Sequence, residues 1–296
     1  MAIDGKTLLV GGDSEIAAAT ATFLRNRGHA VLATTRRSER VSADRPFLDL
    51  SQPLDGWQPP AGTRAACLCA AVARLGDCAN DPDGSARVNV TGILAVADRL
   101  LARGIPLVFL STDKVFEGTR AMMPADSPLC PVSEYGRQKA VAETALGERM
   151  RAGDPAAVLR LSKIVSPGMP LIAGWARDLA ESKPIRAFYD MMMAPVPVAA
   201  VAAAIECLLA APTHGIFQLS GPRDIAYSEV AARLAAMIGA DPALIEPLSA
   251  DTVLPPIGIR AQHTTLDSSA LRDRFGLSVS DPSKLLDDLI RTCLPA

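Results

Sequence analysis

The sequence predicts an α/β fold built on a doubly wound parallel sheet, with a smaller α/β lobe toward the C-terminus. Three observations predict it. Short apolar runs alternate with stretches of helical spacing along most of the 296 residues, as in repeated βα units. Hydrophobic residues make up 49% of the chain but aromatic residues only 4%, so the core must be mainly aliphatic, as in buried parallel strands. The length exceeds that of a usual single domain, which leaves room for the second lobe.

The first half of the chain supplies strands and helices in alternation. Residues 6–11 form a short apolar run that ends in glycines, and residues 13–28 carry apolar side chains at helical spacing. Further apolar runs of strand length lie at residues 29–34, 64–71 and 105–111, separated by enough chain for helices. The repeat is a βα unit, so these strands are expected to lie parallel.

The second half continues the alternation and adds the smaller lobe. Residues 135–150 predict a helix, 157–161 a strand, 198–209 an alanine-rich helix and 215–219 a further strand. In a doubly wound (Rossmann) sheet, ligands bind at the carboxyl ends of the strands, so the residues after each strand are the functional candidates. We assign a dinucleotide-binding domain to residues 1–165 and 196–219, and a substrate-binding lobe, richer in proline and interrupted helices, to residues 166–195 and 220–296.

The composition argues against several classes of partner. The chain mixes 30 basic with 32 acidic residues for a formal net charge of −2, which predicts no nucleic-acid site. The start of the chain lacks the pattern of a signal peptide, and the apolar residues 194–211 include two prolines and Glu206, so no membrane partner is expected. The six cysteines show no CxxC pair and the three histidines stand apart, which predicts no metal and a reduced, cytoplasmic setting.

The turn after the first strand is a candidate site for a pyrophosphate. Gly11 permits a tight turn, and the helix that follows offers free backbone N–H groups to an anion. The turn lacks the spacing of three glycines, so an ordinary strand-to-helix turn is about as good an interpretation. The acidic side chains would also lie close to phosphates. The candidates are Gly11, Asp13, Ser14, Glu15 and Ile16.

Two arginines follow the second strand. At this place an acidic residue binds the ribose of NAD, whereas an arginine suits the 2′-phosphate of NADP, so Arg36 and Arg37 favour NADP(H) over NAD(H). A solvated basic turn is the alternative. Asp49 follows the next short apolar run and can accept a hydrogen bond from an adenine amino group, although aspartate is also common at the start of a turn.

Tyr135 and Lys139 are the strongest catalytic signal. Four residues apart on a predicted helix, they lie on one face and can meet at one site. A tyrosine with a pKa of about 10 is a poor acid–base group at neutrality, and a nearby ammonium is expected to lower that pKa. Such a pair also arises by chance on surface helices. Its position favours catalysis, because it lies one helix-sized step after Ser111 and Thr112, hydroxyls that end a strand where substrate should bind. Capping of a turn is their alternative role.

These residues resemble the extended short-chain dehydrogenases/reductases, and within them the nucleotide-sugar reductases similar to dTDP-4-dehydrorhamnose reductase. The resemblance covers nearly the whole chain and extends to Asn89 and to residues 111–118, 160–162 and 266–271. It implies that Thr112, Tyr135 and Lys139 are catalytic, with Tyr135 passing a proton while a nicotinamide passes a hydride. It also implies a cofactor cleft lined by the turn at Gly11 together with Arg36, Asp49, Leu50, Ala70, Ala71 and Lys139.

The resemblance predicts an NAD(P)-dependent oxidoreductase that reduces a keto group of a nucleotide-linked sugar or a related polar substrate. Two other functions stay open, namely an epimerase or dehydratase of the same superfamily and a non-catalytic NADP-binding regulatory subunit. The intact set of Thr112, Tyr135 and Lys139 argues against the subunit. The expected partner is a small molecule, and a homodimer stays open.

Lys114 and Lys163 depart from the pattern of the family, which has aromatic residues at these places. Both follow neighbouring predicted strands, so with Arg260 they are candidates for substrate binding. They predict a substrate with more negative charge near its reacting ring than a neutral 4-keto-deoxysugar. The alternative is that each lysine reaches solvent while only its alkyl stem packs. The methionines at 191–193 replace another segment of the family and either line an apolar pocket or fill the core.

Overall fold

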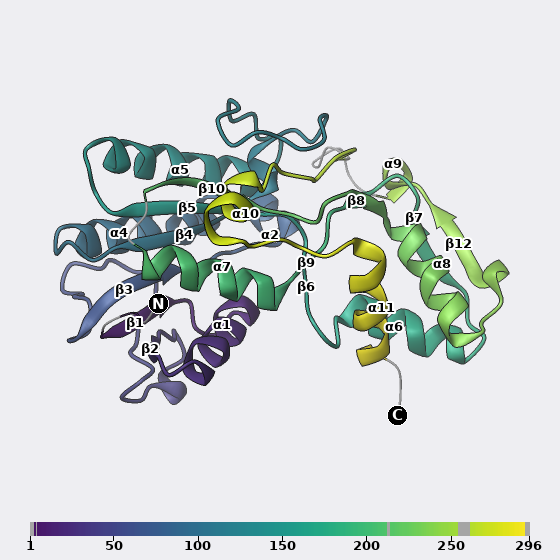
Figure 1. Ribbon diagram of the computed structural model, residues 1–296, viewed down its shortest axis with the longest axis horizontal. Coiled ribbons are helices and arrows are strands. Elements are labelled where there is room, and N and C mark those ends of the chain that lie inside the picture. Colours follow the sequence, from purple (N-terminus) through teal and green to yellow (C-terminus); the bar gives the residue numbers. More distant parts are fainter. Residues whose placement is uncertain (1–2, 4, 212–213, 254–260, 294–296) are drawn as a thin grey trace.

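A six-stranded sheet forms the larger part of the protein (Figure 1). The structure is a computed structural model that describes residues 3, 5–211, 214–253 and 261–293. The strand order is β10-β5-β4-β3-β1-β2 and every neighbouring pair is parallel. This order confirms the predicted doubly wound sheet, with its reversal beside β1. The strands are β1 (Lys6–Val10), β2 (Ala30–Ala33), β3 (Thr63–Leu68), β4 (Leu107–Thr112), β5 (Ala156–Leu161) and β10 (Gly215–Leu219).

Helices cover both faces of this sheet (Figure 1). On one face, α1 (Glu15–Asn26) and α7 (Val198–Ala210) pack against side chains such as Leu9 and Cys67. On the other face, α4 (Ile93–Leu101) and α5 (Glu134–Arg151) pack against Leu8 and Leu68. Successive residues of a strand point to opposite faces, so strands covered on both faces must be mainly apolar. This burial explains the continuous apolar runs of the sequence.

A second core lies beside the sheet, around Trp175, Leu179, Ile185 and Leu234. It is built from α6 (Pro170–Ala180), β7 (Ile185–Phe188), α8 (Tyr227–Ile238), β12 (Ile245–Leu248) and α11 (Pro282–Cys293), with α9 (Ala250–Val253) after β12. In contrast, α10 (Ser269–Phe275) contributes Leu271 to the core of the large sheet, although its residues were assigned to the second lobe from the sequence. Leu271 packs there because the chain returns across β10 after residue 261.

Short elements connect the two cores. β6 (Ile164–Val165) pairs with β9 (Val196–Pro197), and β8 (Met192–Met193) pairs with β11 (Ile225–Ala226). Among the described residues, no helix is both long and apolar enough to cross a membrane. Before α4 the chain forms α2 (Leu75–Asn80), α3 (Pro82–Ala86) and a π-helical turn (Arg87–Gly92), and the 3₁₀ turns are Ser38–Arg40, Asp113–Val115 and Pro242–Leu244.

Candidate active site

Two adjoining cavities open at the carboxyl ends of the central strands. The outer cavity, about 630 Å³, is lined by the turn at Gly11, by Arg36, Arg37 and Asp49, and by the loop after β3. The inner cavity, about 520 Å³, is lined by the predicted catalytic residues and reaches the second lobe. Both cavities share Ser14, Glu15, Ala71 and Ala73, so together they form one elongated cleft. The predicted cofactor and catalytic residues therefore meet along one cleft, as a dinucleotide beside its substrate requires.

The turn after β1 has the shape of a phosphate cradle. Gly11 has a φ of 89°, and a Cβ added to it would lie 2.6 Å from Ala70. Ser14 caps α1 by accepting a hydrogen bond from the backbone N–H of Ala17 at 3.3 Å. The N-terminal end of α1 therefore faces the cleft with its backbone held in place, which suits a pyrophosphate. The residues present fit a nicotinamide dinucleotide.

The two acidic side chains of this turn are already occupied by other groups. Asp13 accepts hydrogen bonds from Thr35 at 2.7 Å and from Arg45 at 2.6 Å. Burial acts to raise the pKa of Asp13, but the Thr35 hydrogen bond and the charge of Arg45 outweigh it, so the pKa lies below its ordinary value. Glu15 accepts a hydrogen bond from Ser166. The charge of Asp13 is thus compensated by Arg45, which removes the objection to a phosphate for this residue, whereas Glu15 lines both cavities without a basic partner in an ion pair among the described residues.

The residues expected to bind the adenosine half differ in their present contacts. Arg36 and Arg37 are exposed and line the outer cavity, and neither guanidinium makes a hydrogen bond within the described chain. Asp49 accepts hydrogen bonds from the N–H of Ser51 at 2.9 Å and from its hydroxyl at 2.7 Å. Asp49 therefore stabilises the start of a turn, which was the alternative to adenine binding. It also lines the cavity beside the buried Leu50.

Thr112 ends β4 at the wall of the inner cavity. Its hydroxyl accepts a hydrogen bond from the backbone N–H of Lys114 at 3.2 Å and donates one to Asp113 at 3.0 Å. It therefore caps the 3₁₀ turn Asp113–Val115 and also faces the cavity. The adjacent Ser111 hydroxyl is buried without a hydrogen-bond partner in the described structure. An unpaired hydroxyl in a cavity wall is a group that a bound ligand can satisfy.

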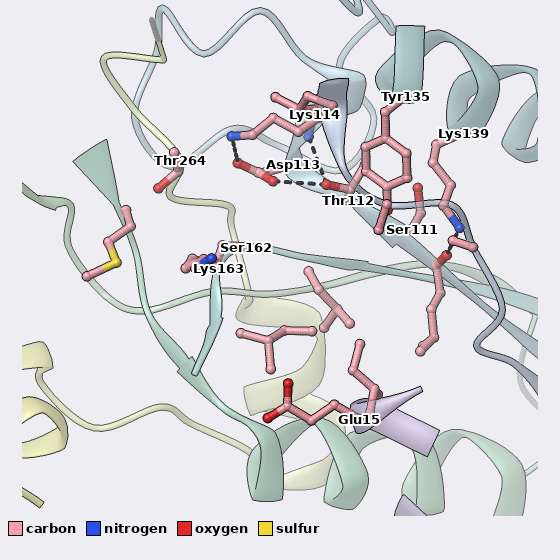
Figure 2. A pocket seen from close by; sticks show the side chains of 18 of the residues that line it. Glu15, Ser111, Thr112, Asp113, Lys114, Tyr135, Lys139, Ser162, Lys163 and Thr264 are labelled. Carbon is pink, nitrogen blue, oxygen red and sulfur yellow. Dashed lines mark hydrogen bonds and ion pairs between the residues drawn. The ribbon is translucent and has the colours of Figure 1, made fainter. Parts of the chain in front are cut away.

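α5 brings Tyr135 to these hydroxyls. Ser133 caps the helix by accepting a hydrogen bond from Gly136 N–H. A Cβ at Gly136 would come within 2.1 Å of the Lys114 carbonyl oxygen, so only glycine allows the helix to approach the turn Asp113–Val115 this closely. In Figure 2 the ring of Tyr135 reaches from α5 toward Ser111 and Thr112. Tyr135 and the hydroxyls of Ser111 and Thr112, which are separated in the sequence, therefore line the same cavity.

A buried amide network fixes the same helix to the loop after β3. Asn89, in the π-helical turn, donates a hydrogen bond to Gln138 of α5 at 2.7 Å. It also accepts from the N–H of Val72 at 2.8 Å and donates to the Val72 carbonyl at 2.9 Å. Because the Asn89 and Gln138 side chains are buried and hydrogen-bonded, the network holds the loop and α5 in one arrangement. The role of Asn89 could be seen only from this packing.

Lys139 is a buried ammonium behind Tyr135. Its Nζ donates to the Leu110 carbonyl at 2.8 Å and lies 4.4 Å from the centre of the Phe109 ring and 5.9 Å from that of Tyr135. Burial lowers the pKa of Lys139 to about 8. Burial, with the charge of Asp113, raises the pKa of Tyr135 above its ordinary value. The expectation that Lys139 lowers the pKa of Tyr135 is therefore wrong for this structure without ligand, because desolvation is stronger, and Tyr135 stays protonated.

The pKa of Lys139 predicts a limit to activity in alkali. A lysine whose pKa is lowered to about 8 loses its proton as the pH rises through that value, and the ammonium is the form that can support Tyr135. We expect kcat/KM, which reports the free enzyme, to fall about tenfold per pH unit above pH 8. Lys139→Arg should lack this limb, since arginine stays charged. A flat profile up to about pH 10 would contradict the assignment.

The inner cavity also contains residues that local patterns did not reveal. Tyr227, at the start of α8, and Thr264 form part of its wall on the side of the second lobe. The methionines at 191–193 line it too, and Met193 is also buried in the second core, so the segment both lines the pocket and fills the core. β8 and β11 pair Met192 with Ala226, so they carry Met192 and Tyr227 to the same wall. Arg260 lies outside the described residues. No group of three or more metal-ligating side chains occurs in the part of the chain that the structure describes.

Comparison with known proteins identifies relatives along the whole chain. A family model described as the RmlD substrate binding domain matches residues 5–293. A protein of Haloferax volcanii, named as a probable low-salt glycan biosynthesis reductase, is 28% identical over 292 residues, covering 91% of this chain and 92% of the relative. The dTDP-4-keto-6-deoxy-D-glucose reductase of Streptomyces niveus is 25% identical over 268 residues, covering 90% of each chain.

Solved structures share the fold. The crystal structure of dTDP-4-dehydrorhamnose reductase from Bacillus anthracis in complex with NADP matches with a TM-score of 0.80 at 17% identity. The match covers 97% of this chain and 99% of that chain, so both the sheet and the second lobe have counterparts.

Proposed function

The chain belongs to the RmlD substrate binding domain family, and from this membership we propose that it is an NAD(P)-dependent oxidoreductase that reduces a keto group of a nucleotide-linked sugar. The observation that carries the proposal is the convergence of Thr112, Tyr135 and Lys139 on one cavity that continues into a cleft fit for a dinucleotide. Its relatives that reduce dTDP-linked keto sugars support the substrate class.

Each predicted catalytic side chain has a role that its position supports. The bound nicotinamide would supply the hydride to the carbonyl carbon. Tyr135 donates its proton to the oxygen, and a raised pKa suits a donor because it keeps the hydroxyl protonated before the reaction. The Thr112 hydroxyl would turn its single proton from Asp113 to the same oxygen and donate a hydrogen bond to it. Lys139 places a positive charge behind Tyr135, which favours the phenolate that remains.

The two cores correspond to two parts of the chain that bind different molecules. The sheet domain carries the cradle at Gly11 and the catalytic residues, so we assign cofactor binding to it. The second core supplies Tyr227 to the far wall of the inner cavity, so we assign substrate binding to that lobe.

The test of this function is consumption of NADPH with a nucleoside diphosphate 4-keto-6-deoxysugar. A reductase oxidises one NADPH for each alcohol formed. An epimerase or dehydratase returns the hydride to its substrate and shows no net NADPH loss. A regulatory subunit binds the cofactor without turnover. Cofactor binding with no net NADPH loss for either dTDP- or UDP-linked substrates would therefore overturn the proposal.

We also propose that NADP(H) is preferred over NAD(H). The guanidinium groups of Arg36 and Arg37 line the outer cavity and make no hydrogen bond within the described residues, and arginine can pair with a 2′-phosphate through two hydrogen bonds. The double variant Arg36→Ala/Arg37→Ala should bind NADPH roughly 10- to 100-fold more weakly than the wild type, whereas its affinity for NADH should change far less. Titration of both cofactors by fluorescence measures this. Equal NADPH affinity in the wild type and the variant would exclude the role.

A further inference from the structure

The charged side chains that line the inner cavity do not balance. Lys114, Lys139 and Lys163 bring three ammonium groups, whereas Glu15 and Asp113 bring two carboxylates. The wall therefore carries one surplus positive charge before any ligand enters. A surplus charge in a partly desolvated cavity is unfavourable unless a ligand neutralises it.

Among these three ammonium groups, that of Lys163 is the one without a hydrogen-bond partner in the described structure, and Lys163 is an exposed residue of the cavity wall. Lys114 donates to Asp113 at 2.7 Å, so this pair is neutral, and Lys139 donates to a backbone carbonyl at 2.8 Å. The ammonium of Lys163 makes no hydrogen bond or ion pair with any residue that the structure describes. Figure 2 shows Lys163 beside Ser162 at the cavity, across from Asp113 and Lys114.

The pKa of Lys163 responds to the same environment. Burial lowers it, and repulsion from Lys114 lowers it further, while Asp113 and Glu15 act in the opposite direction. An anionic group bound beside Lys163 would offset both unfavourable effects. Water can hydrate the exposed ammonium, but a substrate that fills the cavity must replace that hydration.

The position of Lys163 relates it to the reacting end of the substrate. Thr112 pairs with Leu161 on the neighbouring strand β5, and Lys163 follows two residues later. Neighbouring strands are about 4.8 Å apart, so the stem of Lys163 begins close to the hydroxyl that faces the reacting oxygen. We propose, on the basis of the nucleotide-sugar function above, that the sugar of the substrate bears a carboxylate, as in a hexuronate, and that Lys163 binds it.

Phosphate oxygens are a second source of negative charge. Either the diphosphate of the substrate or that of the cofactor would also pair with an ammonium, so the experiment must separate three anions. Matched sugar nucleotides do this. UDP-glucuronate and UDP-glucose share their diphosphate and differ only in a carboxylate in place of a hydroxymethyl group, and dTDP-glucuronate and dTDP-glucose form the same pair on the other base.

The experiment measures dissociation constants of these four compounds by calorimetry with NADP⁺ at saturation. We expect the wild type to bind the glucuronate of at least one pair roughly 10- to 100-fold more tightly than the glucose. Lys163→Met should remove this preference, and Lys163→Gln serves as a second, polar variant. The matched control is Lys183→Met, because Lys183 is an exposed lysine of the second lobe, paired with Glu181, and this variant should keep the preference. NADP⁺ affinity and the unfolding midpoint are measured on each preparation.

Each other outcome has a defined meaning. If the wild type binds the glucuronate and glucose compounds equally tightly, the proposal that the substrate sugar bears a carboxylate is wrong. If the Lys163 variants bind the glucuronate and the glucose compounds more weakly by the same factor, Lys163 binds the substrate diphosphate. If they bind NADP⁺ more weakly, Lys163 binds the cofactor. Either result overturns the inference. If none of the four compounds binds although NADP⁺ does, the nucleotide-sugar function itself fails.

Discussion

Replacing Tyr135 with Phe is expected to lower kcat by about 10²–10⁴-fold, because the reaction loses its general acid. Tyr135 lines the cavity together with Thr112, and the centre of its ring lies 5.9 Å from the Lys139 ammonium. Phe keeps the ring, so the fold and the affinity for NADPH should stay close to those of the wild type. Single-turnover NADPH oxidation with a keto-sugar nucleotide measures the chemical step directly.

Tyr189→Phe is the matched control for this variant. Tyr189 is 55% exposed and does not line the inner cavity, so loss of its hydroxyl should leave kcat unchanged. If Tyr135→Phe retained near-normal kcat while binding NADPH, Tyr135 would not be the proton donor. A loss of NADPH binding would instead show that the hydroxyl holds the cofactor.

Replacing Arg160 with Met is expected to cost about 3–5 kcal/mol of the free energy of unfolding, because it leaves a buried carboxylate without its partner. Arg160, in β5, donates to Glu143 of α5 at 2.7 Å, and their side chains are 1% and 2% exposed. Arg160 also donates to the Ala125 carbonyl at 2.9 Å and to Gln218 of β10 at 3.2 Å. One guanidinium thus joins α5, a loop and two strands. Urea unfolding followed by circular dichroism measures the loss.

Two further variants distinguish the effect of breaking the Arg160–Glu143 ion pair from the effect of changed packing. The double variant Arg160→Met/Glu143→Leu should recover much of the loss, since replacement of a buried pair by apolar side chains is often close to neutral. Arg291→Met removes an exposed partner of Asp288 and should change the free energy of unfolding by less than about 0.5 kcal/mol. A loss below about 1 kcal/mol for Arg160→Met would show that water or rearrangement satisfies Glu143.

The strands, the first turn and the helix that carries Tyr135 and Lys139 were predicted from the sequence because each depends on neighbours along the chain. Apolar runs predicted the six strands of the sheet, since a strand covered on both faces must be mainly apolar. Tyr135 and Lys139 lie on one face of a helix whatever the helix packs against. Gly11 is required by a local φ of 89°, a conformation that glycine adopts without cost.

Only the tertiary structure decided what surrounds these residues. Tyr227 lies about ninety positions after Tyr135 in the chain, and it joins the cavity because β8 and β11 pair in the second lobe. Asp13 is compensated by Arg45, and Arg160 by Glu143, through contacts that no periodicity records. The pKa of Tyr135 rises rather than falls because burial depends on every element packed around it. Local conformation follows from short-range sterics, whereas charge balance and desolvation are set by segments that meet only when the whole chain has folded.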